Sequence, residues 1–273
     1  MMQLYNEISN AIFDVLYAPF GHEYPAFDLL FWPVVMGVVA LIVFKYVSNQ
    51  SAIARVKKQI SMHLLEIRLF SHDIAQVLKS TFSIVGKNSI YVGHNLLPMI
   101  VMLPPMAALM VQLVTHYGYA PSEVGAVELL HLKLDPAASE LASDVSLKLP
   151  PGVSLDAPIV RSADGQVYWR VRADQPGDHV FQITVDGEVF EKGWAVGGGP
   201  RKVPVKRLRS AETLLYPGEP AIPASAPVLS IELETKTRPL AFFPDGEGGI
   251  LLWSFGVSIL AALALKPVFG VTF

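Results

Sequence analysis

Few side chains of this 273-residue chain have the type and spacing that catalysis or metal binding requires. The chain has no cysteine, which excludes a thiolate nucleophile, a disulfide and a cysteine metal site. It also has no P-loop, GxSxG, HExxH or GxGxxG motif. Its histidines lack the clustered spacing of a zinc site, so we predict a non-enzymatic protein with no metal or other cofactor. The histidines are His22, His63, His72, His94, His116, His131 and His179.

Two polar segments stand out from this background. The first, the polar patch, is either an interfacial anchor, since lysine can extend its amine to a membrane surface, or a hydrophilic vestibule that admits a polar segment. The second, the basic loop, is either a solvated loop or a contact for anionic lipid or an acidic partner surface. The polar patch comprises Lys87, Asn88, His94, Asn95 and Gln112, and the basic loop comprises Arg201, Lys202, Lys206, Arg207 and Arg209.

The composition is that of a membrane protein. The chain is 52% hydrophobic and 16% charged, whereas soluble domains carry about a quarter charged residues. Residues 29–47, 96–114 and 249–265 are apolar runs close to the roughly 20 residues that cross a bilayer. They predict three transmembrane helices. Pro104 and Pro105 predict a kink or a break in the second run, with a re-entrant hairpin as the alternative.

The charge distribution predicts an orientation. Residues 45–87 hold seven bases against two acids, and residues 1–44 hold no base at all. Because bases near span ends stay in the cytoplasm, we expect residues 49–87 and the C-terminus to be cytoplasmic. The N-terminus and residues 118–247 would then lie outside the cytoplasm, as in a multi-pass protein of a bacterial inner membrane with a periplasmic domain. A net charge of −3 gives no general attraction to nucleic acid.

The basic segment has a heptad pattern. Apolar residues recur at the a and d positions over residues 49–87, which predicts the seam of a coiled-coil arm that binds a partner. The pattern leaves open a single rod or two helices folded back near residues 70–73. The predicted partner-binding residues are Ile53, Val56, Ile60, Ile67, Phe70, Ile74 and Val77.

The remaining segments complete a membrane α + β fold. Residues 1–24 have the spacing of an amphipathic helix that lies on the outer leaflet. Residues 118–240 alternate between apolar and polar side chains and include a hairpin signal at Asp186-Gly187, which predicts an immunoglobulin-like β-sandwich with a proline-rich return. The expected order is this helix, then span 25–48, arm 49–87, span 88–117, the β-sandwich 118–240, and the last span with a short tail, 241–273.

The order of these parts resembles the minimal core of the YidC/Oxa/Alb insertase superfamily, and it is similar to the three-span branch that includes the insertase subunit of the ER membrane complex. The resemblance covers residues 25–116 and 249–266. It is carried by VFKYVSNQSAIARVKKQISMHLLEIRLFSHDIAQVLKSTFSIV (43–85) followed by LLPMIVMLPPMAALMVQL, a layout also seen in uncharacterised bacterial membrane proteins. Residues 29–44 lack the buried arginine that bacterial insertases carry in their first span, and the β segment lies outside the shared core.

The resemblance implies a role in membrane-protein insertion, chaperoning or complex assembly. The alternative is a structural accessory subunit of a larger membrane complex, which docks through the arm and the β domain. In either case the expected partners are lipids and other membrane proteins, and the oligomeric state stays open.

Overall fold

The computed structural model describes residues 2–19 and 24–271, so His22 lies outside the described residues. The chain divides into two compact units. The first comprises Met1–Leu29 and Leu109–Trp253, and the second comprises Leu30–Ala108 and Ser254–Phe273.

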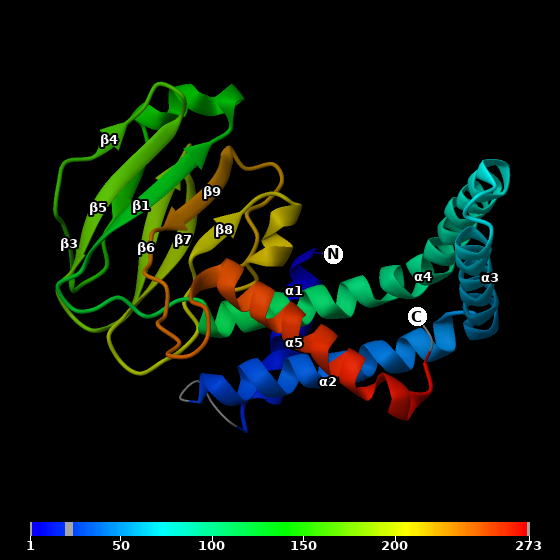
Figure 1. The fold of residues 1–273 in the computed structure, drawn as a ribbon. Coiled ribbons are helices and arrows are strands. Elements are labelled where there is room, and N and C mark those ends of the chain that lie inside the picture. The colour runs from blue at the N-terminus through cyan, green and yellow to red at the C-terminus, as the bar shows by residue number, and fades with distance from the viewer. Residues whose placement is uncertain (1, 20–23, 272–273) are drawn as a thin grey trace. The chain divides into compact units, whose positions relative to one another are not determined.

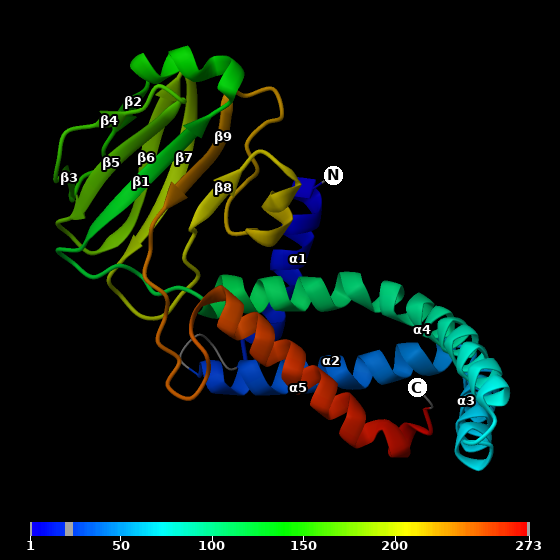
Figure 2. The ribbon, with the colours of Figure 1, turned by 45° about the horizontal axis from the view of Figure 1, so that its top comes forward.

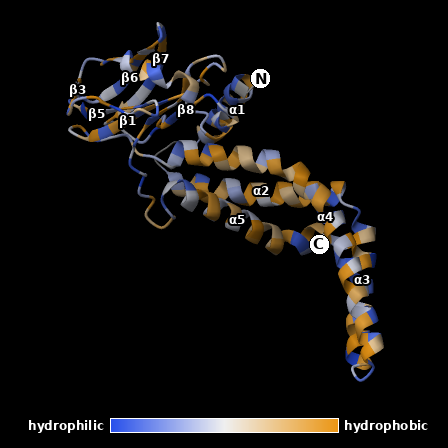
Figure 3. Ribbon diagram, turned by 90° about the horizontal axis from the view of Figure 1, so that it is seen from above, coloured by the Kyte–Doolittle hydropathy of each residue, from blue (hydrophilic) through white to orange (hydrophobic). Residues whose placement is uncertain are grey.

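Among the described residues, three helices are long and apolar enough to cross a membrane by length and composition: α2 (Pro25–Val47), α4 (Ile74–Tyr117) and α5 (Gly246–Phe269). Hydrophobic residues dominate α2 and α5, whereas polar and apolar residues alternate along α3 (Gln50–Leu69) (Figure 3). The structure therefore confirms the three membrane-length helices and supports a membrane-embedded, multi-pass protein.

Helix α4 runs without interruption through Pro98, Pro104 and Pro105. The possibility of a break at Pro104 and Pro105 is therefore wrong, and the chain does not turn back here as a re-entrant hairpin would require. Each proline removes its own N–H donor and crowds the carbonyl four residues earlier, which bends a helix, but the neighbouring backbone bonds carry α4 past it.

In the second unit, α2 and α5 pack closely at a glycine. A Cβ atom added to Gly37 would lie 2.5 Å from the carbonyl oxygen of Ser258 and 3.0 Å from the Cβ of Ala261. Small residues allow the backbones of membrane helices to approach each other in this way. Gly37 is therefore required by the close contact between these two helices.

The heptad segment folds into a hairpin, not a single rod. Helix α3 ends at Leu69, and α4 begins at Ile74 after Asp73, whose carboxylate accepts a hydrogen bond from the backbone N–H of Gln76 at 3.1 Å. The hydroxyl of Ser80 donates to the carboxylate of Glu66 at 2.8 Å, which links the two helices. We call residues 50–87 the hairpin arm.

The first unit contains a β region of two antiparallel sheets (Figures 1 and 2). The larger sheet has the order β3-β5-β1-β9-β8, with β4 also paired to β5, and the smaller has the order β2-β6-β7. The strands are β1 (Val127–Leu134), β2 (Ser146–Lys148), β3 (Val153–Leu155), β4 (Val160–Arg161), β5 (Gln166–Ala173), β6 (Gly177–Val185), β7 (Glu188–Val196), β8 (Lys206–Leu208) and β9 (Val228–Leu233).

The inward-facing residues of both sheets form one core. Trp169 of the larger sheet and Phe181 and Trp194 of the smaller sheet are fully buried in it, and the last two rings stack with centroids 5.7 Å apart. Asp186 and Gly187 both have positive φ, as the two-residue turn between β6 and β7 requires. The predicted hairpin is therefore confirmed.

The proline-rich return, which comprises residues 197–227, carries short elements of its own. Strand β8 pairs with β9, and the 3-10 helix η2 (Ala211–Leu215) begins at Ser210, whose hydroxyl accepts from the N–H of Glu212. A second 3-10 helix, η1 (Pro136–Ser143), follows β1. Such short elements lack the apolar periodicity from which longer ones are predicted.

Candidate functional site

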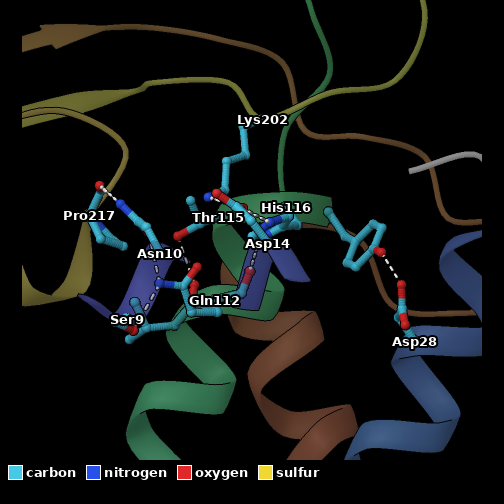
Figure 4. A network of polar contacts seen from close by, with 11 residues as sticks. Ser9, Asn10, Asp14, Asp28, Gln112, Thr115, His116, Lys202 and Pro217 are labelled. Carbon is cyan, nitrogen blue, oxygen red and sulfur yellow. Dashed lines mark hydrogen bonds and ion pairs between the residues drawn. The ribbon is translucent and has the colours of Figure 1, made fainter. Parts of the chain in front are cut away.

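Helix α1 (Met2–Tyr17) binds the β region through its polar face. The side-chain amide of Asn6 is buried and donates to the carbonyl oxygen of Thr213 in η2 at 3.0 Å. Asn10, one helical turn further, donates to the carbonyl oxygen of Pro217 at 2.8 Å (Figure 4). These bonds tie α1 to the segment that precedes β9.

The same polar face of α1 binds the end of α4. The buried amide nitrogen of Gln112 donates to the hydroxyl of Ser9 at 3.0 Å and to the side-chain oxygen of Asn10 at 2.9 Å (Figure 4). Asn10 therefore bonds both α4 and the β region. Helix α1 is held between these two parts of the first unit.

His116 extends this network along α4. Its Nδ1 lies 2.8 Å from the carbonyl oxygen of Gln112, and its Nε2 lies 3.1 Å from the carboxylate of Asp14. A carbonyl oxygen and an ionised carboxylate only accept hydrogen bonds, so both bonds form together when the imidazole is protonated. A buried cationic His116 would thus be matched by the acidic Asp14 of α1.

The carboxylate of Asp14 also accepts a hydrogen bond from the Nζ of Lys202 at 2.6 Å (Figure 4). Partial burial raises the pKa of Asp14, but the hydrogen bonds and charges of Lys202 and His116 outweigh that effect and hold the pKa below its ordinary value. Asp14 is therefore an ionised carboxylate that joins α1, α4 and the basic loop.

A second set of contacts joins the ends of the three membrane-length helices. Asp28, fully buried in the first turn of α2, accepts the hydroxyl of Tyr117 at the end of α4. The guanidinium of Arg238 lies over the ring of Tyr117, 5.7 Å from its centroid. The indole N–H of Trp253 in α5 donates to the carbonyl oxygen of Leu29 in α2 at 3.0 Å.

Glu247, in the first turn of α5, accepts hydrogen bonds from the hydroxyls of Tyr119 and Tyr216. Burial and the neighbouring carboxylate of Glu247 raise the pKa of Tyr119, so this phenol stays a donor. We use the name polar junction for this network of contacts. It comprises α1, Asp28, residues 112–119, Lys202, residues 213–217 and Glu247. Its groups hydrogen-bond one another and the backbone, an arrangement that fixes helices in place.

The predicted partner-binding residues separate into inner and outer positions of the hairpin arm. Ile53 and Val56 are buried, Ile60, Ile67 and Val77 are half-buried, and Phe70 and Ile74 are exposed. The break at residues 70–73 resets the helical phase, so the inner face of α4 continues through Val77, Ser80 and Ile84 instead of Ile74 and Thr81. A single heptad series therefore does not describe the arm.

The outer faces of the hairpin arm carry two apolar stripes that no described part of the chain covers. Leu69 is 72% exposed, Ile74 75% and Phe82 72%. These residues repeat at helical spacing on the side of each helix opposite its inner face. We call them the outer stripes: Met62, Leu65 and Leu69 on α3, and Ile74, Leu78 and Phe82 on α4.

The structure divides the polar patch. Lys87, His94 and Asn95 are half-buried along α4 in the second unit, and Asn88 is exposed there. The side-chain nitrogen of Asn95 donates to the carbonyl oxygen of Tyr91 within the same helix. Gln112 instead belongs to the polar junction of the first unit, so the five residues do not form one cluster.

All five cations of the basic loop bind acceptors within the first unit, so the loop differs from a freely solvated one. Arg201 pairs with Asp178, Lys202 with Asp14, Lys206 with Glu232 and Arg209 with Asp135, and Arg207 donates to the carbonyl oxygens of Glu191 and Pro220.

A buried ion pair between Lys192 and Glu219 is not predicted by the sequence analysis. Lys192 points into the protein from β7 and is 0% exposed; its Nζ donates to Glu219 at 2.6 Å and to the carbonyl oxygen of Pro204 at 2.8 Å. Burial lowers the pKa of Lys192, while Glu219 opposes that shift. The only sequence signal is a lysine at a core-facing strand position, one residue from Gly193 and two from Trp194.

Three further histidines contact different residues. His63 contacts Glu66, His131 stacks on Tyr168 with centroids 4.4 Å apart, and the Nε2 of His179 lies 2.9 Å from the carbonyl oxygen of Gln175. Within residues 2–19 and 24–271, no three His, Asp or Glu side chains come together as a metal site would require.

No family model matches this sequence, and comparisons with curated proteins and with solved structures find no match.

Proposed function

We propose that this chain is a non-enzymatic membrane protein that binds other membrane proteins through the hairpin arm and acts in their insertion, chaperoning or assembly. The observation that carries the proposal is the pair of outer stripes. A folded protein rarely exposes a large contiguous apolar surface unless that surface meets a partner or a membrane. Leu65, Leu69 and Phe82 lie on the exposed side of the arm, opposite the buried seam.

The charge of the hairpin arm supports a protein partner. Its two acids are used inside the arm, because Glu66 accepts from Ser80 and Asp73 caps α4. Exposed bases, Lys58, Arg68 and Lys79, flank the outer stripes. The surface is therefore apolar with a positive border, and it complements an amphipathic segment that carries acidic residues.

The membrane orientation forms part of the proposal. The hairpin arm and the C-terminus would face the cytoplasm of a bacterium, and the β region, of the immunoglobulin-like class, would lie outside, beyond the inner membrane. The support is the excess of bases in residues 45–87 beside two membrane-length helices. The resemblance to the three-span insertases agrees with this order of parts.

The second candidate is a fixed accessory subunit of a larger complex. The polar junction favours it, because Asn10, Asp14 and Gln112 hold α1, α4 and the β region together as a rigid scaffold. The two functions differ in partners: an assembly factor binds many clients briefly, whereas a subunit binds a fixed set at constant stoichiometry.

Purification in mild detergent followed by mass spectrometry tests the proposal. The variant Leu65→Asp/Leu69→Asp places two charges in one outer stripe and is expected to lose the co-purifying membrane proteins. The matched control, Ser51→Asp/Ser61→Asp, adds the same charge at exposed polar positions of the same helix and should retain them.

Retention of the partners by Leu65→Asp/Leu69→Asp, with normal protein levels, would contradict binding through the arm. A single stoichiometric complex in the wild type would favour the accessory subunit. A varied set of membrane proteins whose abundance falls on depletion would favour insertion or assembly.

A further inference from the structure

The apolar face of α1 points away from every contact that α1 makes. Ile8 is 51% exposed, Ile12 52% and Val15 73%, and together with Leu4 they follow one another at helical spacing. The hydrogen-bonded residues Asn6 and Asn10 lie on the opposite side of the helix. Helix α1 thus packs the side of Asn6 and Asn10 against the first unit and leaves its apolar stripe exposed.

Helix α1 binds α4 close to the end of that membrane-length helix. Ser9 and Asn10 bind Gln112, which lies five residues before the end of α4 at Tyr117. At 1.5 Å per residue this is roughly 7 Å from the helix end. Interfacial helices lie about 5–10 Å into the boundary between headgroups and acyl chains. With the end of α4 at the membrane surface, the bonds to Gln112 would hold α1 at the depth of an interfacial helix.

The charges of α1 select the kind of lipid. Interfacial helices commonly carry lysine and arginine that bind anionic headgroups. Helix α1 has no base; its charged residues are Glu7 and Asp14, and Asp14 is paired with Lys202. The contact must therefore depend on the apolar stripe alone and need no anionic lipid.

From these observations we infer that the apolar face of α1 (Leu4, Ile8, Ile12 and Val15) is seated in the membrane interface against zwitterionic lipid. The opposite face carries the β region through Thr213 and Pro217. Helix α1 is thereby a strap between the lipid surface and the β region, and this role does not depend on the function proposed for the hairpin arm.

Spin-label accessibility tests this inference on the full chain in phosphatidylcholine nanodiscs. Because the chain has no cysteine, a single cysteine labels a single position. Nitroxide labels at Ile8→Cys and Ile12→Cys should collide with lipid-soluble oxygen in preference to a water-soluble nickel chelate. Labels at Gln3→Cys, on the polar flank of α1, and at Asp186→Cys, in the turn between β6 and β7, should show a stronger preference for the chelate.

Three outcomes separate the possible occupants. Preference for oxygen at Ile8 and Ile12, unchanged when anionic lipid is added, supports the inference. Access of the nickel chelate to Ile12 equal to that at Asp186 would overturn it, because α1 would then face water. Protection of Ile12 from both reagents would also overturn it, because protein would then cover the stripe.

Discussion

Helix α1 and the hairpin arm both leave an apolar stripe uncovered, but they bury opposite kinds of surface. Helix α1 packs the buried Asn6 and the half-buried Asn10 against the first unit and is held there largely by hydrogen bonds, with the ring of Tyr17 packed at its end. The hairpin arm buries Ile53 and Val56 and is held mainly by apolar packing. Exposure of an apolar stripe alone therefore does not identify its partner; the opposite face and the bordering charges are also needed.

The charges that border the two apolar surfaces are a second difference between the hairpin arm and α1. The outer stripes of the arm are flanked by Lys58, Arg68 and Lys79, whereas α1 has no base. A positive border suits a partner with acidic residues, and a border without bases suits neutral lipid. The comparison predicts a protein contact at the arm and a lipid contact at α1.

The largest expected effect concerns the sides of the membrane on which the two regions lie. A reporter active only outside the cytoplasm should be fully active when fused after Gly187 in the β region, and silent when fused after Gln59 in the arm. Equal activity at both positions, at comparable protein levels, would place both regions on one side and remove the basis of the comparison.

The second-largest expected effect is the loss of stability when the buried ion pair between Lys192 and Glu219 is removed. Glu219→Ala leaves the ammonium of Lys192 buried without its carboxylate, which should cost about 3–5 kcal/mol in the free energy of unfolding of the β region. The segment that Glu219 anchors also supplies Lys202 and Pro217 to the polar junction.

Near-UV circular dichroism during denaturation measures that change, with Glu212→Ala, an exposed acid in η2, as the control that should unfold like the wild type. Binding of partners to the arm should persist under native conditions. A Glu219→Ala protein as stable as the control would show that the pair contributes little.

The smallest expected effect is a pH dependence of the polar junction. Because the pKa of Asp14 is lowered in the folded protein, its contribution to stability is present above the ordinary carboxyl value and is lost as the pH falls through the lowered value. Protonation breaks its pairs with Lys202 and His116. The protection of the α1 amides, relative to their intrinsic exchange rate at each pH, should fall below about pH 4.

Asp14→Asn provides the control for this titration, since it removes the titrating group and should flatten the pH dependence over the acidic range. The amides of the hairpin arm should keep their own profile in Asp14→Asn, because its carboxylates, Glu66 and Asp73, lie in other contacts. An identical acidic transition in Asp14→Asn would assign the effect to another group.

Much of the fold could be predicted from periodicity. The three membrane-length helices, the turn at Asp186-Gly187 and the core residues Trp169 and Phe181 all follow from patterns of near neighbours. The fold-back near residues 70–73 is one of the two alternatives that the heptad pattern leaves open. The change of helical phase could not be predicted, because apolar residues continue the heptads across these residues. Asp73, a helix-capping type, is the local signal that favours the hairpin over the rod.

The polar junction could not be predicted, because its contacts join residues far apart in the sequence. Asp14 and Lys202 are 188 positions apart, and neither carries a local signal for the other. For the same reason the sequence gives no sign that the cations of the basic loop have partners within the chain. They pair with Asp14, Asp135 and other distant acceptors. The amphipathic pattern of α1 revealed its two faces but not that the protein covers the polar one.

Photo-crosslinking in living cells tests the central claim that the outer stripes bind other membrane proteins. A photoreactive residue at Phe82, in an outer stripe, should form adducts with other membrane proteins, and these adducts should vanish in Leu65→Asp/Leu69→Asp. The same residue at Ile84, on the inner face, should crosslink within the chain. Crosslinks from Phe82 to lipid alone, or protein adducts that survive the double substitution, would contradict the proposed function.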